Sequence, residues 1–167
     1  MLKNAIIRTD FSKNTRFYAC DFETTTSSIA KDHTSVWSFA VDEIGEFQPE
    51  IFGGISDFFD FCGDPYRGID KRMYFHNLKF DGEFILYEAL RRGFHTAYVD
   101  GKMLQPRKLI NNEMCYAISD MGQWYYIAFR YNNCLCEIRD SLKILPMTLE
   151  QIGKSFCKKY RKSTMDY

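Results

Sequence analysis

The sequence predicts an α/β domain in which helices pack on a mixed β-sheet, and three observations support this prediction. The chain has 167 residues, a length typical of one domain and sufficient to bury a core of its own. β-rich runs and helical patterns follow one another in the order strands, helix, strand, helix, strands, helix. No internal repeat, low-complexity segment or linker rich in Pro and Ser divides the chain. We therefore expect a single compact domain.

The first part of the chain supplies strands and one short helix. Residues 16–22 (RFYACDF) and 35–44 (SVWSFAVDEI) are apolar and aromatic runs typical of strands, and residues 46–52 (EFQPEIF) can complete a meander. Residues 56–64 (SDFFDFCGD) open with a serine that can cap a short helix. Residues 71–77 (KRMYFHN) then read as a buried strand.

The most regular helical pattern covers residues 80–94 (FDGEFILYEALRRGF). Phe80, Phe84 and Tyr87 recur at helical spacing, with Leu90 on the adjoining stripe. Two arginines in the last turn and a following glycine are typical of a helix end.

The second part of the chain predicts short strands and a final helix. The strands are residues 96–99 (TAYV), 114–120 (MCYAISD), 124–131 (WYYIAFRY) and 134–140 (CLCEIRD), of which the last two flank a hairpin turn at Asn132 and Asn133. Residues 147–160 (MTLEQIGKSFCKKY) form an amphipathic helix with Thr148 and Gln151 at capping-box spacing. The ribonuclease-H-like architecture is one fold with this order of elements.

Composition limits the partners and the compartment. The 22 basic and 22 acidic residues give a net charge of zero, so a polyanion would have to meet a local patch. With 15 Phe and 11 Tyr, the chain can stack bases as well as pack a core.

The six cysteines form no CxxC pair, and Cys134 and Cys136 share one face of a strand, so we expect reduced thiols in a cytoplasmic protein. No run of about 18 apolar residues predicts a membrane span.

The stretch CDFETTT (20–26) carries the first candidate site. Asp21 and Glu23 lie two residues apart at a strand end, so both carboxylates point to one face with Cα atoms about 7 Å apart. Two carboxylates on one face can bind Mg²⁺ or Mn²⁺, which prefer oxygen ligands. The alternative is a solvated strand end. In both interpretations Phe22 faces the core.

The stretch YFHNLKFDGEF (74–84) carries the second candidate site, at a strand-to-helix junction. Asp81 can stabilise the helix N-terminus through the helix dipole by about 0.3 to 1 kcal/mol. Alternatively, Asp81 is a third metal-binding carboxylate, Asn77 hydrogen-bonds a substrate, and Tyr74, Phe80 and Phe84 flank nucleic-acid bases.

Four ordered stretches, YACDFETTT, YFHNLKFDGEF, MGQWYYI and DSLKILP, resemble the 3′–5′ proofreading exonuclease domain of protein-primed family B DNA polymerases of phages and linear plasmids. The resemblance extends from about Arg16 to the last residue. It implies an exonuclease domain of the ribonuclease-H-like, DEDD type over residues 16–167, after an N-terminal extension of residues 1–15. It also implies a role in DNA replication, in the host cytoplasm if the protein is phage-encoded.

The resemblance also implies roles for individual residues. Asp21, Glu23 and Asp81 match catalytic carboxylates that bind Mg²⁺ or Mn²⁺, and Lys162 matches a lysine that assists the chemistry. A further set matches positions that contact single-stranded DNA: Thr24, Tyr74, His76, Asn77, Phe80, Phe84, Ser141 and Leu142. The implied reaction is two-metal hydrolysis of a phosphodiester at a single-stranded 3′ end. The implied partners are single-stranded DNA and a separate polymerase chain or a terminal protein.

The sequence departs from the family pattern in one respect. Enzymes of this class use a fourth acid in a YxxxD motif downstream of the lysine, and no such motif follows Lys162. Asp166 and Tyr167 are adjacent and in reverse order, and Asp120 and Asp140 are weaker candidates. We therefore expect weak or absent hydrolysis and no polymerase activity. Three explanations stay open: a fragment of a longer polymerase, a split gene whose other part supplies the missing aspartate in trans, or a domain retained for binding after loss of catalysis. The alternative functions are a catalytically inactive module that binds single-stranded nucleic acid or a protein, and a purely structural protein.

Overall fold

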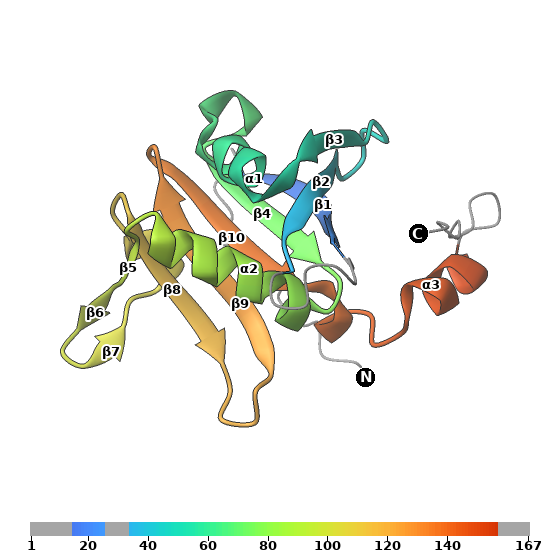
Figure 1. The fold of residues 1–167 in the computed structure, drawn as a ribbon. Coiled ribbons are helices and arrows are strands. Elements are labelled where there is room, and N and C mark those ends of the chain that lie inside the picture. Colours follow the sequence, from blue (N-terminus) through green and yellow to red (C-terminus); the bar gives the residue numbers. More distant parts are fainter. Residues whose placement is uncertain (1–14, 26–33, 157–167) are drawn as a thin grey trace, which may run out of the picture.

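The computed structural model describes residues 15–25 and 34–156 of the chain (Figure 1). The strands are β1 (Thr15–Thr24), β2 (Val36–Glu43), β3 (Glu50–Gly53), β4 (Asp70–Phe75), β5 (His95–Thr96), β6 (Tyr98–Val99), β7 (Lys102–Met103), β8 (Glu113–Ile118), β9 (Trp124–Tyr131) and β10 (Cys134–Asp140). The helices are α1 (Gly54–Gly63), α2 (Leu78–Arg91) and α3 (Leu149–Phe156), with short 3₁₀ turns η1 (Pro65–Arg67), η2 (Pro106–Lys108) and η3 (Ser141–Lys143).

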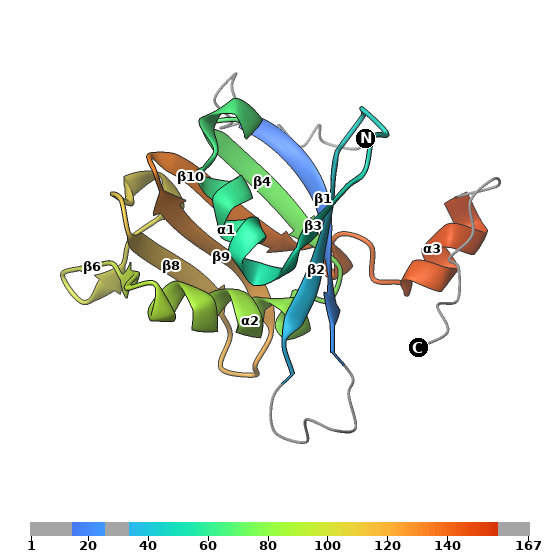
Figure 2. The same ribbon diagram turned by 45° about the horizontal axis from the view of Figure 1, so that its top comes forward.

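The strands form one mixed sheet of eight and one small sheet of two. The large sheet has the order β3-β2-β1-β4-β10-β9-β8-β5, and β6 pairs with β7. Helices α1 and α2 lie over the same face of the large sheet, while α3 stands away from it (Figures 1 and 2). The predicted α/β class, a mixed sheet with packed helices, is confirmed.

The centre of the sheet consists of three parallel strands. Strand β4 pairs in parallel with β1 on one side and with β10 on the other, with Ala19 opposite Tyr74 and Asp140 opposite Phe75. The carboxyl ends of β1, β4 and β10 therefore meet at one edge. In α/β sheets this edge is the usual place for a ligand site.

The main core lies between the sheet and helices α1 and α2. On β1, Phe22 is buried with its ring centroid 4.9 Å from that of Phe75 and 5.2 Å from that of Phe58. Phe22 faces the core, as predicted. Because side chains alternate along a strand, its neighbours Asp21 and Glu23 project to the opposite face.

A smaller cluster covers part of that opposite face. Ile127 of β9 belongs to the main core, whereas Ala128 packs with Ala97, Leu109 and Leu135. The segment between β5 and β8 thus covers the sheet beside β8 and β9.

Helix α2 packs on the sheet through Gly82 and Ile85, while most of its aromatic stripe stays exposed. Phe80, Tyr87 and Leu90 are 50%, 69% and 58% exposed, while Ile85 and Gly82 are buried. A Cβ atom on Gly82 would lie 2.7 Å from Cζ3 of Trp124, so the glycine allows the helix backbone to approach β9 closely. The small residue therefore decides which side of the helix faces the sheet.

The start of α1 also differs from the prediction. Ser56 does not cap the helix, which begins at Gly54. Instead, Oδ2 of Asp57 in the first turn accepts a hydrogen bond from the backbone N–H of Gly53 at 2.8 Å. The carboxylate of the first turn thus satisfies the backbone N–H of the residue that precedes the helix.

Other local predictions are confirmed. The capping box of α3 forms, with Thr148 N–H donating to Gln151 Oε1 at 2.9 Å and Gln151 N–H to Thr148 Oγ1 at 3.2 Å. Asn132 and Asn133 take positive φ values of 47° and 64°, as a tight hairpin turn requires. The predicted strand over residues 96–99 is divided between β5 and β6, which belong to different sheets.

Cys134 and Cys136 share one buried face of β10, as predicted. Their thiols approach the backbone carbonyls of Gly63 and Cys62 at 3.6 and 3.4 Å. The five cysteines within the described ranges are free thiols. No helix in the described residues combines the length and apolarity needed to span a bilayer.

Candidate nucleic-acid and metal site

Three strand ends supply most of the predicted site residues. Asp21, Glu23 and Thr24 lie in the last part of β1. His76 and Asn77 follow β4, which ends at Phe75 rather than continuing to residue 77 as predicted. Ser141 and Leu142 follow β10 in η3. Residues of three segments that lie about 50 to 120 positions apart in the sequence are thus brought to one edge of the sheet.

Asp81 lies in the first turn of α2 and is only 5% exposed. Burial, together with the negative charges of Asp21 and Glu23, raises the pKa of its carboxyl to about 7. The charges of Asp21 and Glu23 therefore repel a negative charge on Asp81. The position in the first helical turn agrees with the helix-dipole interpretation as well, since a backbone N–H there favours the charged form.

The chemistry of these three side chains fits a divalent cation. Carboxylate oxygens are the ligands that Mg²⁺ and Mn²⁺ prefer, and a cation would offset the repulsion that raises the Asp81 pKa. In the part of the chain that the structure describes, however, no group of three His, Cys, Asp or Glu side chains is arranged as a ready metal site.

The junction between β4 and α2 is held by a carboxylate from β10. Asn77 has a left-handed backbone conformation, with φ 66° and ψ 57°, and its backbone N–H donates to Oδ1 of Asp140 at 3.1 Å. The side chain of Asn77 makes no capping hydrogen bond and is exposed. The same Oδ1 accepts a second hydrogen bond, from the backbone N–H of Leu142 at 3.0 Å.

A second link joins the same two segments. Ser141 Oγ donates to the carbonyl of Phe75 at 3.1 Å, and Nδ1 of His76 lies 3.1 Å from the same Oγ. Because the serine has one proton and directs it to Phe75, the His76 Nδ1 is the donor to Ser141. This arrangement leaves the Nε2 side of the His76 ring available to a ligand.

An apolar groove of about 520 Å³ opens beside these residues. Four predicted site residues line it: Asp21, Tyr74, His76 and Ser141. Its apolar wall includes Ala19, Ala40, Ile44, Ile144 and Leu145. The groove therefore borders one of the three carboxylates, Asp21, and three of the residues predicted to contact DNA.

The remaining predicted residues within the described ranges do not line this groove. Phe80 and Phe84 form an edge-to-face pair on α2 with ring centroids 5.4 Å apart, and Phe80 is half exposed. Thr24 ends β1 just after an irregular pairing with β2. Lys162 lies outside the described residues.

Sequence reasoning missed the role of Asp140. Sequence reasoning predicted only a weaker candidate for a metal ligand, whereas in the structure Asp140 is buried and one of its oxygens accepts from two backbone N–H groups. The stretch Asp140-Ser141-Leu142 does predict half of this, because an aspartate often accepts a hydrogen bond from the residue two positions later. The contact to Asn77 has no local signal.

The chain is similar to DNA polymerases of phages. The family model described as DNA polymerase type B, organellar and viral, matches residues 66–167. The DNA polymerases of Bacillus phages Nf and phi29 are both 34% identical, over 158 and 161 residues, which is 91% of this chain and 25% of each relative. The DNA polymerase of Streptococcus phage Cp-1 is 30% identical over 153 residues, 85% of this chain and 23% of that protein.

Solved structures of phi29 DNA polymerase give the same result. The complex with single-stranded DNA matches with a TM-score of 0.74 at 32% identity, over 91% of this chain and 25% of that one. The binary complex with primer-template DNA matches with a TM-score of 0.73 at 30% identity, over 92% of this chain and 25% of that one. The chain thus spans about a quarter of the length of these relatives, and its predicted ribonuclease-H-like fold class is confirmed.

Proposed function

Since this chain belongs to the type B DNA polymerases of organelles and viruses, we propose that it forms a 3′–5′ exonuclease domain that binds single-stranded DNA. One observation carries the proposal: Asp81 is buried within the electrostatic influence of Asp21 and Glu23, and Asp21 lines a groove together with Tyr74 and His76. Carboxylates beside an aromatic groove suit the hydrolysis of a nucleic-acid end.

Several residues hold the DNA strand in this proposal. The groove has the size of a small-ligand site, so it can receive one nucleotide beside Asp21. His76 presents a ring nitrogen to the strand, and the exposed side-chain amide of Asn77 can hydrogen-bond a base or sugar. Phe80, half exposed and supported by Phe84, can stack on a neighbouring base.

The three carboxylates bind the cofactor in this proposal. Asp21, Glu23 and Asp81 would hold Mg²⁺ or Mn²⁺, which when bound supplies an activated water and stabilises the charge on the departing 3′ oxygen. Asp81 must lose its proton to bind a cation, and because burial raises the pKa of this carboxyl to about 7, we expect cation binding to weaken as the pH falls below about 7. A role for Lys162, and a separate polymerase chain or terminal protein as partner, stay predictions.

A second candidate function is binding of single-stranded DNA without hydrolysis. It is favoured by one observation: the described residues contain no group of three potential ligands arranged to hold a metal ion. The two candidates share the DNA-binding residues and differ only in turnover.

One experiment separates the two candidates. A 5′-labelled single-stranded oligonucleotide is incubated with the protein in Mg²⁺ or Mn²⁺ for turnover, and in EDTA for binding by fluorescence anisotropy. We expect shortening from the 3′ end by the wild type and at least a 100-fold loss in Asp21→Ala/Glu23→Ala, with no loss in the exposed-residue control Asp60→Asn. Binding without shortening would select the second candidate. Shortening that persists in the double variant, or no binding at all, would refute the assignment of this site.

The aromatic contact has its own test. Phe80→Ala should weaken binding of the oligonucleotide in EDTA by about 5- to 10-fold, the effect of losing one stacked base. Tyr87→Ala is the matched control, because Tyr87 is also an exposed aromatic residue on α2 but lies two turns from the first turn of the helix. Equal losses of affinity in both variants would show that the exposed aromatic residues of α2 bind DNA without a defined stacking site at Phe80.

A further inference from the structure

We propose that Asp140 is a positioning residue, which fixes the two DNA-binding segments of the site, His76–Asn77 and Ser141–Leu142, relative to each other. The inference rests on the proposed function, because it assigns a role within the same DNA-binding site. Asp140 itself is buried, so it acts through its neighbours rather than on the DNA strand.

The geometry carries the proposal. Oδ1 of Asp140 accepts from the backbone N–H of Asn77 at 3.1 Å and from that of Leu142 at 3.0 Å. Asn77 lies 63 residues before Asp140, so a single oxygen connects two segments that the sequence keeps far apart. At 5% exposure this carboxylate has little access to water, and hydrogen bonds to a charged acceptor are stronger than neutral ones.

The contact to Asn77 also holds an unfavourable backbone conformation. Residues other than glycine rarely adopt φ near +66°, and asparagine is among those that tolerate it best. In that conformation the Asn77 N–H points to Asp140 while the side-chain amide remains exposed and free of any capping bond. Loss of the carboxylate would leave this donor without its partner, and the junction would shift together with His76.

The chain contains a second aspartate that performs only the capping half of this role. Asp64 precedes η1 with φ −83° and ψ 112°, and Asp140 precedes η3 with φ −82° and ψ 110°. Each side chain accepts from the backbone N–H two residues later, that of Tyr66 at 2.9 Å for Asp64. The bond to a distant junction is therefore not a requirement of the cap.

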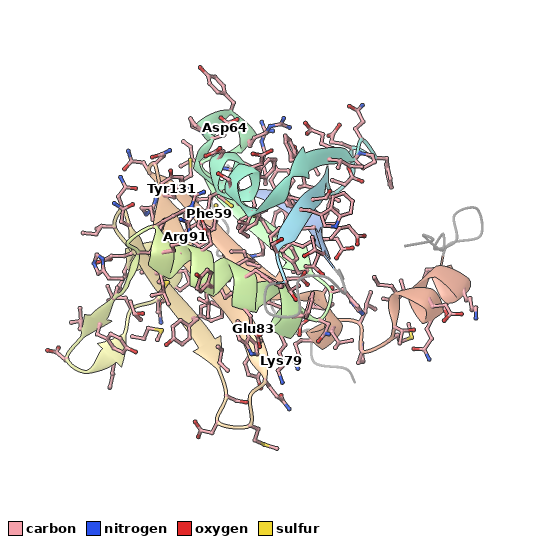
Figure 3. All side chains as sticks on the ribbon, in the orientation of Figure 1. Phe59, Asp64, Lys79, Glu83, Arg91 and Tyr131 are labelled. Atoms are coloured by element: carbon pink, nitrogen blue, oxygen red, sulfur yellow. The ribbon has the colours of Figure 1, made fainter. Side chains whose placement is uncertain are left out.

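Asp64 is also far from the site. It lies at the end of α1, well separated from the first turns of α2, where Lys79 and Glu83 are labelled (Figure 3). Asp64→Ala is thus a matched control that removes a cap of the same geometry without touching the DNA-binding residues.

Three substitutions at position 140 separate the two hydrogen bonds. Asp140→Asn keeps an oxygen that can accept both bonds. Asp140→Ser keeps a hydroxyl that can cap η3 but is too short to reach Asn77. Asp140→Ala removes both acceptors. Each variant is measured for thermal unfolding, and for binding of a single-stranded oligonucleotide by anisotropy in EDTA, at least 15 °C below its own melting temperature (roughly the width of an unfolding transition).

We expect a specific order of affinities. Asp140→Asn should bind within about 3-fold of the wild type, whereas Asp140→Ser and Asp140→Ala should each bind about 10-fold more weakly while folded, a loss comparable to that of one hydrogen bond to a charged group. Asp64→Ala should lower the melting temperature by several degrees and leave the affinity unchanged. Wild-type affinity in folded Asp140→Ser would overturn the proposal, as would an equal loss of affinity in Asp64→Ala.

A double-mutant cycle adds a readout that a purely structural role would not change. Asn77→Ala should weaken binding by about 10-fold in the wild type but by only about 2-fold in Asp140→Ser, because the amide is already misplaced there. Additive losses would overturn the positioning role. A wild type that binds no oligonucleotide would overturn the proposed function and this inference together, whereas a wild type that binds and a position 140 that has no effect would overturn this inference alone.

Discussion

Replacing the buried carboxyl of Asp81 by an amide should stabilise the metal-free protein at alkaline pH. Asp81 is 5% exposed, and burial together with the charge of Asp21 raises its pKa from 3.8 to about 7. The ionised form is thus disfavoured in the folded state but not in the unfolded chain. Asp81→Asn keeps the shape of the side chain and removes the charge.

The magnitude follows from the two pKa values. A raised pKa means that the folded state holds the proton more tightly, so the stability contributed by this group is complete below pH 3.8 and is lost as the pH rises through about 7. At about 1.4 kcal/mol per pKa unit, the loss of stability is about 4 kcal/mol at pH 8, where the folded carboxyl is ionised, and about 2 kcal/mol at pH 5, where it keeps its proton while the unfolded chain ionises. Asp81→Asn should gain these amounts in the free energy of unfolding.

The measurement is urea unfolding, followed by circular dichroism, in EDTA at pH 5, 6.5 and 8. The gain of Asp81→Asn over the wild type should increase with pH, while Asp60→Asn, which changes an exposed aspartate of α1, should stay within about 0.5 kcal/mol of the wild type. Adding Mg²⁺ should stabilise the wild type and not Asp81→Asn, because a ligand that binds only the folded state raises its stability. A variant less stable than the wild type at pH 8 in EDTA would refute the reasoning.

Two further predictions concern packing and buried charge. Gly82→Ala should destabilise the protein by about 1 to 3 kcal/mol, because the new methyl group would lie 2.7 Å from the rigid Trp124 ring, whereas Gly153→Ala, with open space at its Cβ, should not destabilise it; urea midpoints test both. Lys71→Met should lower stability by about 3 kcal/mol or more, since its buried ammonium donates to three backbone carbonyls at 2.6 to 2.9 Å. Thermal unfolding should show no comparable loss in the exposed control Lys79→Met, and equal effects of the two lysine substitutions would contradict the role of these bonds.

Local sequence patterns predicted most of the elements. The alternation of Asp21, Phe22 and Glu23 correctly placed the phenylalanine in the core, because strand side chains point to opposite faces in turn. The capping box of α3 and the hairpin turn between β9 and β10 were also predicted correctly. Each of these features depends on hydrogen bonds or dihedral angles within a few residues, so the nearby sequence is sufficient to specify it.

The orientation of α2 could not be predicted in this way. The sequence pattern places Phe80 and Tyr87 on one stripe but does not determine which side of the helix packs on the sheet, and both side chains prove to be exposed. The face that packs is the one with Gly82, because the ring of Trp124 from β9 occupies the space next to the helix backbone. The partner that decides the packing lies more than 40 residues away in the sequence.

The sequence by itself determined which residues are the candidates for chemistry and in what order the strands and helices carry them. Only the tertiary structure decided how those residues act on one another. It buried Asp81 near Asp21 and Glu23, which raises its pKa, and it joined Asn77 to Leu142 through one oxygen of Asp140. The reason is physical: periodicity and capping are local, whereas desolvation and hydrogen bonds between segments arise only where distant strands meet.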